Sequence, residues 1–464
     1  MANRMSSTSV RRPSAPFWGA AAAAYQIEGA TGEDGRGESI WDRFCSTPGK
    51  VLNGDNGDLA CDFYHRSAAD IVLMKELGLE AFRFSISWSR VLPQGTGQIN
   101  TRGLDFYDRL VDQLLENGIR PFATLYHWDL PQVLEDAGGW PVRDTVDAFV
   151  ELTTAVAERL GDRVGHWVTV NEPWVVAWLG YGLGIHAPGR TSNKDALAAA
   201  HNLLLAHGRA TAVLRELVPD AEVGITVDLE YAEPASSADA DAEAVVAFDG
   251  SRNRWFLEPV FHGAYPAEAF ARAGDDAPTI ADGDLETIAV PIDFLGINYY
   301  QRVLIAADPA TGDPVAVRAP GLERTGMGWE VYPGGLEHLL TRVAREYGPK
   351  AIHITENGAA YDDARGPDGG IDDPERVSYL ARHVAAVERA IASGVPVEGY
   401  FVWTLLDNFE WAWGYSKRFG IVYVDFSTLE RVPKSSFRWY RDFIASRNGG
   451  AVGAASGTEY SRSP

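Results

Sequence analysis

The sequence has few cysteines and no long apolar run. Among its 464 residues only Cys45 and Cys61 are cysteines, which is too few for a disulfide framework. Such scarcity is typical of a reducing compartment, so we expect a cytoplasmic location, and one bridge between the two cysteines is the less favoured alternative. No apolar stretch reaches about 18 residues, the length that a membrane-spanning helix needs.

Basic residues are outnumbered by acidic ones. The sequence has 41 Lys and Arg against 64 Asp and Glu, which gives a formal net charge of −23. A surface of this sign repels the phosphates of nucleic acids and of anionic lipids, so we expect neither nucleic acid nor membrane partners. The sequence also lacks the HExxH, CxxC and Walker motifs, and the acidic turn at residues 55–58 does not match a calcium loop. We therefore expect no metal and no cofactor.

Hydrophobic residues make up 46% of the chain, and aromatic residues are plentiful, with 14 Trp, 18 Tyr and 19 Phe. Apolar, β-branched runs alternate with amphipathic helical runs such as residues 104–118, a pattern typical of a parallel sheet covered by helices. Eight such strands with no dinucleotide-type glycine loop predict an α/β fold, a single (β/α)₈ TIM barrel with elaborated loops after the strands. The predicted strands are residues 17–24, 81–87, 120–127, 166–172, 222–228, 293–300, 351–357 and 397–405.

No linker divides the chain, so we expect one catalytic barrel over residues 15–446. Arg11 and Arg12 precede a short apolar run in the order of a signal peptide, but nearby prolines interrupt it, so residues 1–14 are interpreted as a disordered leader. The Gly, Ala and Ser content of residues 447–464 predicts a disordered tail. Residues 232–245 and 361–376 are predicted to be acidic surface loops.

Two predicted strands end in a carboxylate. Glu172 closes the fourth strand in "VTVNEPW", and Glu356 closes the seventh in "AIHITENG". A buried charge costs several kcal/mol unless it has a partner or a function. Side chains at the carboxyl ends of barrel strands converge over the pore, so these two glutamates can face each other. Facing carboxyls are what cleavage of a glycosidic bond requires.

The other strand ends also carry polar or aromatic side chains, and only the fifth strand supplies no candidate. Each side chain alone has an ordinary structural explanation, such as a buried ion pair for Arg83 or a core histidine for His127. Their concentration at one rim is what indicates a sugar site. These candidates are Gln26, Arg83, His127, Trp128, Asn298, Tyr300, Trp403, Glu410 and Trp411.

The motifs "YQIEG", "RFSISW", "YHWDLP", "TVNEPW", "INYY", "ITENG", "LLDNFEW" and "KRFGIVYVDF" occur in this order over about residues 17–444. The chain thereby resembles glycoside hydrolase family 1, the β-glucosidase type. This resemblance implies that Glu172 is the acid/base and Glu356 the nucleophile. It further implies that Arg83, Asn298 and Tyr300 hold Glu356, and that Trp174 and Trp329 flank the aglycone. The residues implied to bind the sugar are Gln26, His127, Trp128, Asn171, Trp403, Glu410, Trp411 and Phe419.

The resemblance predicts a retaining double displacement, with the two carboxyl groups about 5 to 5.5 Å apart. Arg83 and the Tyr300 hydroxyl favour an ionised Glu356, whose charge raises the pKa of Glu172 and keeps it protonated for the first step. Once the sugar has esterified Glu356, that charge is lost, and Glu172 ionises more easily to act as a base. The expected substrates are β-D-glucosides and short oligosaccharides such as cellobiose.

Other functions stay open on the sequence. A 6-phospho-β-glycosidase is one, because Ser416, Lys417 and Arg418 add basic character near the site, although Glu410 would repel a phosphate. A non-catalytic sugar-binding barrel is another, but both glutamates are present. The choice among glucose, galactose and fucose, the aglycone range, the share of transglycosylation and the oligomeric state are not determined by the sequence.

Overall fold

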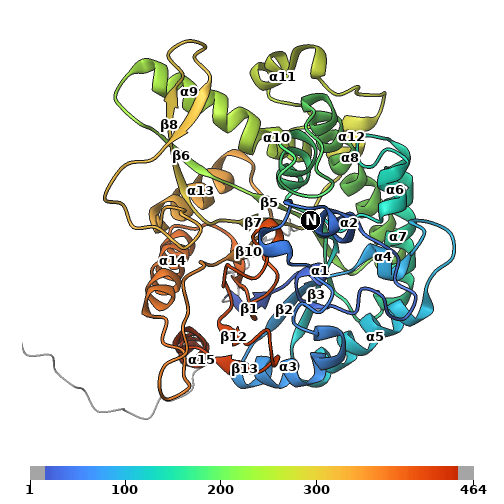
Figure 1. The fold of residues 1–464 in the computed structure, drawn as a ribbon. Coiled ribbons are helices and arrows are strands. Elements are labelled where there is room, and N and C mark those ends of the chain that lie inside the picture. The colour runs from blue at the N-terminus through green and yellow to red at the C-terminus, as the bar shows by residue number, and fades with distance from the viewer. Residues whose placement is uncertain (1–15, 448–464) are drawn as a thin grey trace, which may run out of the picture.

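The computed structural model describes residues 16–447, and its centre is a closed barrel of eight parallel strands (Figure 1). Around the barrel the strand order is β1, β11, β10, β7, β5, β4, β3 and β2, which closes the sheet on itself. The predicted TIM barrel is therefore confirmed. Its strands are β1 (Phe17–Ala21), β2 (Ala81–Ser85), β3 (Arg120–Tyr126), β4 (His166–Asn171), β5 (Glu222–Asp228), β7 (Phe294–Asn298), β10 (Ile352–Asn357) and β11 (Val397–Trp403).

All eight predicted strands are present, but most end one to three residues earlier than predicted. The fourth predicted strand includes Glu172, whereas β4 ends at Asn171 because Glu172 has a positive φ of 50° and leaves the strand conformation. Trp128 likewise has a φ of 75° shortly after β3 ends. The apolar runs in the sequence thus predicted where the strands lie. They did not predict where the strands end, because the ends depend on backbone turns at the rim of the pore.

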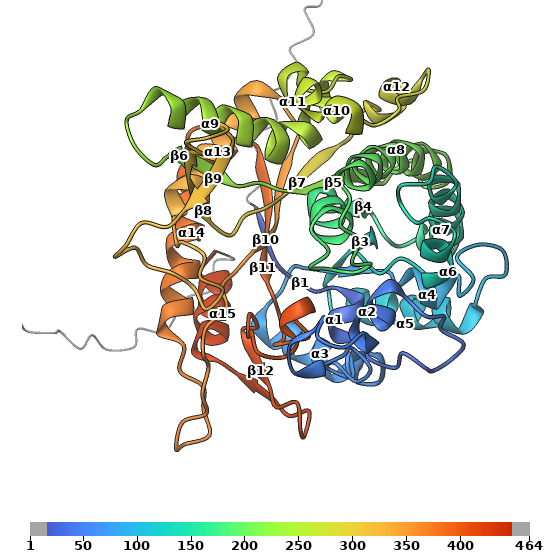
Figure 2. The same ribbon diagram turned by 45° about the horizontal axis from the view of Figure 1, so that its top comes forward.

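Helices surround the barrel and present their apolar faces to it (Figure 2). In α5 (Thr101–Glu116), Leu104, Tyr107, Leu110 and Leu114 are buried, as their spacing predicts. The other long helices are α3 (Phe63–Leu77), α7 (Asp144–Leu160), α8 (Asn193–Leu217), α13 (Pro333–Glu346), α14 (Pro374–Ala392) and α15 (Ser435–Arg447).

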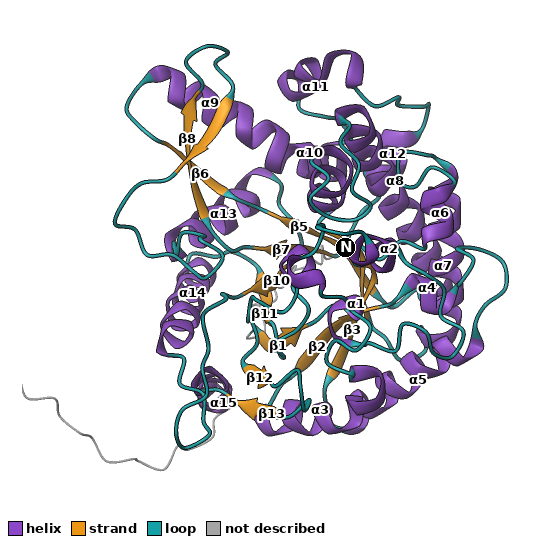
Figure 3. Cartoon of the chain, in the orientation of Figure 1, coloured by secondary structure: helices purple, strands orange, loops and turns teal. Residues whose placement is uncertain are grey.

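Shorter elements elaborate the loops after the strands. Two small sheets lie outside the barrel, one of β6, β8 and β9 and one of β12 and β13 (Figure 3). The strands are β6 (Tyr231–Pro234), β8 (Arg302–Ala307), β9 (Pro314–Val317), β12 (Val422–Val424) and β13 (Arg431–Pro433). The short helices are α1 (Ala24–Ile27), α2 (Ile40–Ser46), α4 (Trp88–Val91), α6 (Gln132–Asp136), α9 (Asp239–Asp249), α10 (Trp255–His262), α11 (Ala267–Ala273) and α12 (Asp284–Ile288), together with η1 (Leu52–Gly54), η2 (Val175–Gly182), η3 (Gly250–Arg254), η4 (Gly274–Asp276) and η5 (Trp411–Trp413).

The prediction of two acidic surface loops is wrong in part. Residues 232–245 contain most of β6 and the start of α9, so this segment is largely regular structure. In residues 361–376, the side chains of Asp363 and Asp373 are buried and both form ion pairs with Arg376. Composition alone could not distinguish these buried, paired carboxylates from solvated ones.

A buried ionic cluster supports the loop that follows β11. Lys434 is fully buried and donates to Asp363 at 2.5 Å and to Asp407 at 2.7 Å. Arg418 also pairs with Asp407, at 2.7 Å. Asp407 thus fixes the start of the segment that carries Glu410 toward the barrel mouth.

Replacing Lys434 with Met will destabilise the protein by about 3 to 5 kcal/mol, because two buried carboxylates lose their shared cation. The control is Lys350→Met, since Lys350 has an exposed side chain and lies 3.4 Å from Asp293, and we expect it to change stability by less than about 1 kcal/mol. Denaturant unfolding of both variants measures this difference. Equal destabilisation by the two substitutions would contradict the importance of the buried cluster.

Both cysteines are buried, and they do not form a disulfide with each other in the structure. Within residues 16–447, no helix is both long enough and apolar enough to cross a membrane. The predicted leader, residues 1–14, lies outside the described residues. The predicted tail, residues 447–464, also lies outside them except for Arg447, which is the last residue of α15.

Candidate active site

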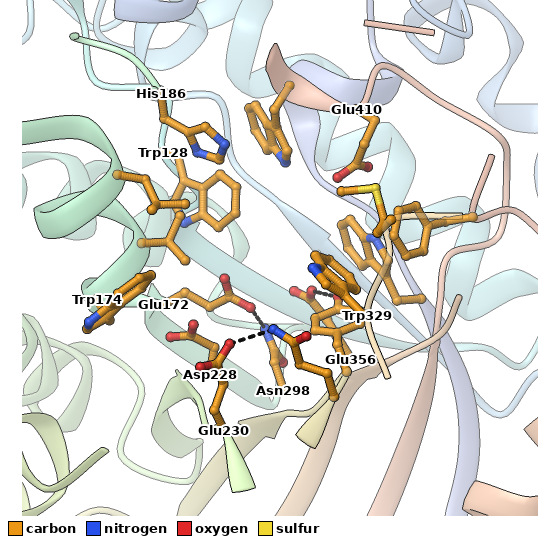
Figure 4. A pocket seen from close by; sticks show the side chains of 18 of the residues that line it. Trp128, Glu172, Trp174, His186, Asp228, Glu230, Asn298, Trp329, Glu356 and Glu410 are labelled. Carbon is orange, nitrogen blue, oxygen red and sulfur yellow. Dashed lines mark hydrogen bonds between the residues drawn. The ribbon is translucent and has the colours of Figure 1, made fainter. Parts of the chain in front are cut away.

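A cavity of about 310 Å³ opens at the carboxyl ends of the barrel strands, and both predicted glutamates line it (Figure 4). Three predicted site residues, Gln26, Arg83 and Asn171, are buried but are not part of the cavity wall. All the other predicted residues line it, namely His127, Trp128, Glu172, Trp174, Asn298, Tyr300, Trp329, Glu356, Trp403, Glu410, Trp411 and Phe419. The structure therefore brings the predicted site together.

Two donors hold Glu356 at the end of β10. Arg83 on β2 donates to Glu356 Oε1 at 2.6 Å, and the Tyr300 hydroxyl donates to Oε2 at 2.5 Å. Burial raises the pKa of Glu356, while the charge of Arg83 and the Tyr300 hydrogen bond oppose that rise. Because each carboxyl oxygen of Glu356 accepts a hydrogen bond, this environment stabilises the carboxylate form.

Glu172 has one hydrogen-bond donor, and its environment favours the protonated form. The Asn298 amide donates to Glu172 Oε1 at 2.5 Å. Burial raises the pKa of Glu172 well above its usual value, and the charges of Asp228 and then Glu356 add to the rise. The predicted effect of Glu356 on Glu172 is thus present, but burial and Asp228 contribute more.

Asn298 interacts with Glu172 as well as with Glu356, the residue it was predicted to hold. The expectation was that Asn298 holds Glu356, whereas its amide donates to Glu172 and to Asn171. It is still close enough to Glu356 to lower the pKa of that carboxyl slightly. Asn298 pairs in register with Asp228 on β5 and with Glu356 on β10, so it is a sheet neighbour of Glu356 although its amide donates to Glu172.

The side of the cavity nearest β1 and β11 carries groups suited to a sugar. Gln26 Nε2 donates to the backbone oxygen of Phe409 at 2.9 Å and to Glu410 at 3.3 Å, while Gln26 Oε1 is buried without a hydrogen-bond partner in residues 16–447. His127 stacks against Trp403 with ring centroids 5.9 Å apart. Burial and the charge of Glu356 raise the pKa of Glu410 to about 8.

Three residues of the cavity wall have left-handed backbone conformations that non-glycine residues rarely adopt. Trp128, Glu172 and Trp411 have φ values of 75°, 50° and 51°. Each such residue costs about 1 to 3 kcal/mol, a cost that proteins accept mainly where function fixes the geometry. The neighbouring structure holds them: Trp128 Nε1 donates to the backbone oxygen of Asn171 at 3.0 Å, and its ring lies 4.6 Å from that of Trp411.

The outer wall of the cavity is aromatic. Trp329 lies 5.2 Å from Tyr300 and 5.9 Å from Phe419, measured between ring centroids. Trp174 lines the cavity next to Glu172, and the guanidinium of Arg252 lies 3.8 Å from the centre of its ring. These rings provide flat apolar surfaces on the side open to solvent.

Sequence reasoning missed a group of charged residues after β5. The fifth strand was predicted to supply no candidate, and this is wrong, because Asp228 at its end lines the cavity. The rule that identified Glu172 and Glu356, a carboxylate closing an apolar strand, could have identified Asp228 as well. Its partner Arg252 lies on η3, and no local sequence signal pointed to it. The other residues that line the cavity and were not predicted are Val175, Leu179, Ile185, His186, Leu229, Glu230, Gln301, Met327 and Trp413.

The basic residues after Trp411 do not face the cavity. Lys417 donates to the backbone oxygen of Gly326 at 2.7 Å, and Arg418 pairs with Asp407. The Ser416 hydroxyl donates to the backbone oxygen of Trp413 at 2.7 Å. None of the three lines the cavity, so they supply no cation for a sugar phosphate there.

Comparisons with known proteins agree with this geometry. The profile of glycosyl hydrolase family 1 matches residues 10–449. The chain is 50% identical to beta-glucosidase A of Acetivibrio thermocellus over 92% of this chain and 97% of that protein. It is 45% identical to a bifunctional beta-D-glucosidase/beta-D-fucosidase of Bifidobacterium breve, over 93% of this chain and 98% of that one.

A solved structure shares the fold as well. The beta-glucosidase of Thermotoga maritima in complex with castanospermine superposes with a TM-score of 0.91 at 48% identity, covering 95% of this chain and 99% of that one. The strand-end glutamates, the barrel and these similarities together show that the chain belongs to glycosyl hydrolase family 1.

Proposed function

We propose that Glu172 is the acid/base and Glu356 the nucleophile of a retaining β-glucosidase. The observation that carries this assignment is the unequal solvation of the two carboxyls. Glu356 accepts from Arg83 and from Tyr300, whereas Glu172 has a single amide donor and a pKa raised well above its usual value. One group is therefore suited to attack and the other to donate a proton.

In the first step a Glu356 oxygen forms a bond to the anomeric carbon while the bond to the leaving oxygen breaks. That oxygen takes the proton of Glu172, so the aglycone leaves as an alcohol and Glu172 becomes a carboxylate. In the second step water gives a proton to Glu172 and its oxygen attacks the anomeric carbon, which releases Glu356 as a carboxylate. The anomeric configuration is retained, and no metal or cofactor enters the balance.

The substrates we propose are aryl and alkyl β-D-glucosides and short β-gluco-oligosaccharides such as cellobiose, bound by the terminal non-reducing sugar. Gln26, His127, Asn171, Glu410 and Trp411 would bind its hydroxyls, with Trp403 under the ring and Trp128 and Phe419 closing the pocket. Support comes from the unpartnered Gln26 Oε1 and His127 Nδ1, which are buried beside the cavity. Trp174 and Trp329 would flank the aglycone.

The test is a kinetic panel of aryl β-glycosides, with proton NMR of the first anomer released. We expect hydrolysis of the glucoside with β-glucose appearing first, and much weaker hydrolysis of the 6-phosphoglucoside, because Glu410 lines the cavity and the basic residues do not. Release of the α-anomer, or a preference for the phosphorylated substrate, would contradict the proposal. We also propose a cytoplasmic location, which the two unpaired cysteines support.

A further inference from the structure

A charged cluster lies beside Glu172 that the double displacement itself does not require. Asp228 is buried at the end of β5, where Arg252 donates to its backbone oxygen at 2.9 Å and also to its carboxylate. Glu230 lies 3.5 Å from Arg252 and accepts from Gln301 at 2.8 Å. Figure 4 shows the carboxyls of Glu172, Asp228 and Glu230 directed toward the same part of the cavity.

Strand register fixes Asp228 close to the reacting groups. The backbone nitrogen of Glu172 donates to the backbone oxygen of Thr226 on β5 at 2.9 Å. Asp228 follows Thr226 by two residues, so the two side chains lie on the same face of β5. On its other side Asp228 pairs with Asn298, the residue that donates to Glu172. Asp228 Oδ1 is buried and has no protein hydrogen-bond partner among the described residues.

The cation of this cluster does not cancel its negative charge. Arg252 is held in place by stacking on Trp174, and it is shared between two carboxylates, Asp228 and Glu230. Two carboxylates and one guanidinium give the cluster a net charge of −1. Such a charge within a buried cavity disfavours a second negative charge on its neighbour Glu172.

We propose that Asp228 is a positioning residue for Glu172, and that its charge, countered in part by Arg252, raises the proton affinity of Glu172 in both halves of the reaction. This proposal rests on the proposed acid/base role of Glu172. The charge of Glu356 vanishes when the sugar esterifies it, but no step of the reaction consumes the charge of Asp228. In the glycosyl-enzyme, Glu172 therefore has a higher proton affinity than it would have if Glu356 were the only carboxylate beside it.

Several other groups face this part of the cavity and contribute to the same balance. Asp228 precedes Glu230 on the β5 side, Glu356 lies on the β10 side, and Tyr300 follows β7. Arg83 donates to Glu356 and to Asn171, the residue before Glu172. The charged and titratable groups that line the cavity around Glu172, together with Arg83 behind its wall, are Arg83, His127, His186, Asp228, Glu230, Arg252, Tyr300, Glu356 and Glu410.

The test uses two substitutions with opposite expected signs. For a substrate with a poor leaving group, such as methyl β-glucoside, the basic limb of the kcat/KM profile reports the acid form of Glu172. Asp228→Asn removes a negative charge, so we expect this limb to move to lower pH by about one unit. Arg252→Gln leaves Asp228 without its cation, so we expect the limb to move to higher pH.

The second half of the reaction is read with 2,4-dinitrophenyl β-glucoside, whose leaving group needs no acid. When deglycosylation limits kcat, the acid limb of its pH profile reports Glu172 acting as a base in the glycosyl-enzyme. Asp228→Asn is expected to extend this limb to lower pH. An acid limb identical to that of the unchanged enzyme would contradict a charge that persists after Glu356 is esterified.

Glu233→Gln is the matched control, because Glu233 is on β6, pairs with Arg302 and does not line the cavity. It should leave both limbs in place. If Asp228→Asn does not fold, Glu230→Gln removes one charge of the same cluster and should move the basic limb in the same direction. Limbs that stay fixed, or that move the same way in Asp228→Asn and Arg252→Gln, would overturn the proposal. Failure of the acid/base assignment itself would appear separately, as normal turnover of methyl β-glucoside by Glu172→Ala.

Discussion

Glu356→Gln will lose about 10⁵-fold or more in kcat for an aryl β-glucoside, because the carboxylate that forms the covalent intermediate is replaced by a neutral amide. The environment adds to the loss, since Arg83 and Tyr300 each donate to one carboxylate oxygen of Glu356, and the amide offers them only one uncharged oxygen. Steady-state kinetics with p-nitrophenyl β-glucoside measure the effect. A control, Glu337→Gln, removes a carboxyl that pairs with Arg389 on the outside of the barrel, and it should leave kcat unchanged.

The stereochemistry of rescue makes this prediction specific. In Glu356→Ala the space left by the side chain can admit azide, which would attack the anomeric carbon from the face that Glu356 normally occupies. The product would then be the α-glucosyl azide, formed with inversion in a single displacement. Formation of the β-glucosyl azide by this variant, or turnover close to that of the unchanged enzyme, would contradict the assignment of Glu356 as the nucleophile.

Glu172→Ala should show losses that depend on the leaving group. For methyl β-glucoside or cellobiose we expect about a 10³-fold or greater loss in kcat/KM, because the variant lacks the proposed proton donor to a basic leaving oxygen. For 2,4-dinitrophenyl β-glucoside the first step should be nearly normal, since that phenolate leaves without a proton. Only the second step, which needs a base, should be slow, so the glycosyl-enzyme should accumulate.

Azide should rescue the second step of Glu172→Ala by attacking the glycosyl-enzyme, which gives the β-glucosyl azide with net retention. The two variants thus differ in the configuration of their products. Pre-steady-state kinetics with 2,4-dinitrophenyl β-glucoside check the accumulation, and NMR of the azide product checks its configuration. Equal losses for good and poor leaving groups would contradict an acid/base role for Glu172.

The sequence predicted most of the barrel because each strand is a short apolar run bounded by turns, and β1, β2, β3, β4, β5 and β11 begin at the predicted residue. The sequence predicted the carboxyl-terminal ends of the strands, at the rim of the pore, less accurately. There the ends of strands depend on residues such as Glu172 and Trp128, whose left-handed backbone conformations no propensity predicts. Tertiary contacts around the cavity fix those conformations.

The same limit applies to the site. Glu172, Glu356 and the sugar-binding candidates were predictable because they lie in motifs at strand ends. Arg252 was not, because it reaches Asp228 from η3, a separate segment of the chain. The hydrogen bond from Asn298 to Glu172 was not predicted for a similar reason, since the strand-end rule places a side chain at the rim without saying which neighbours it contacts.

The most direct test of the account is to trap the covalent intermediate. A 2-deoxy-2-fluoro-β-glucoside with a good leaving group slows both steps but slows deglycosylation enough for the glycosyl-enzyme to persist. Mass spectrometry of the intact protein should show one fluoroglucosyl group per chain, and peptide mapping should place it on Glu356. An unlabelled enzyme, or a label on Glu172 or Glu410, would contradict the assignment on which the mechanism depends.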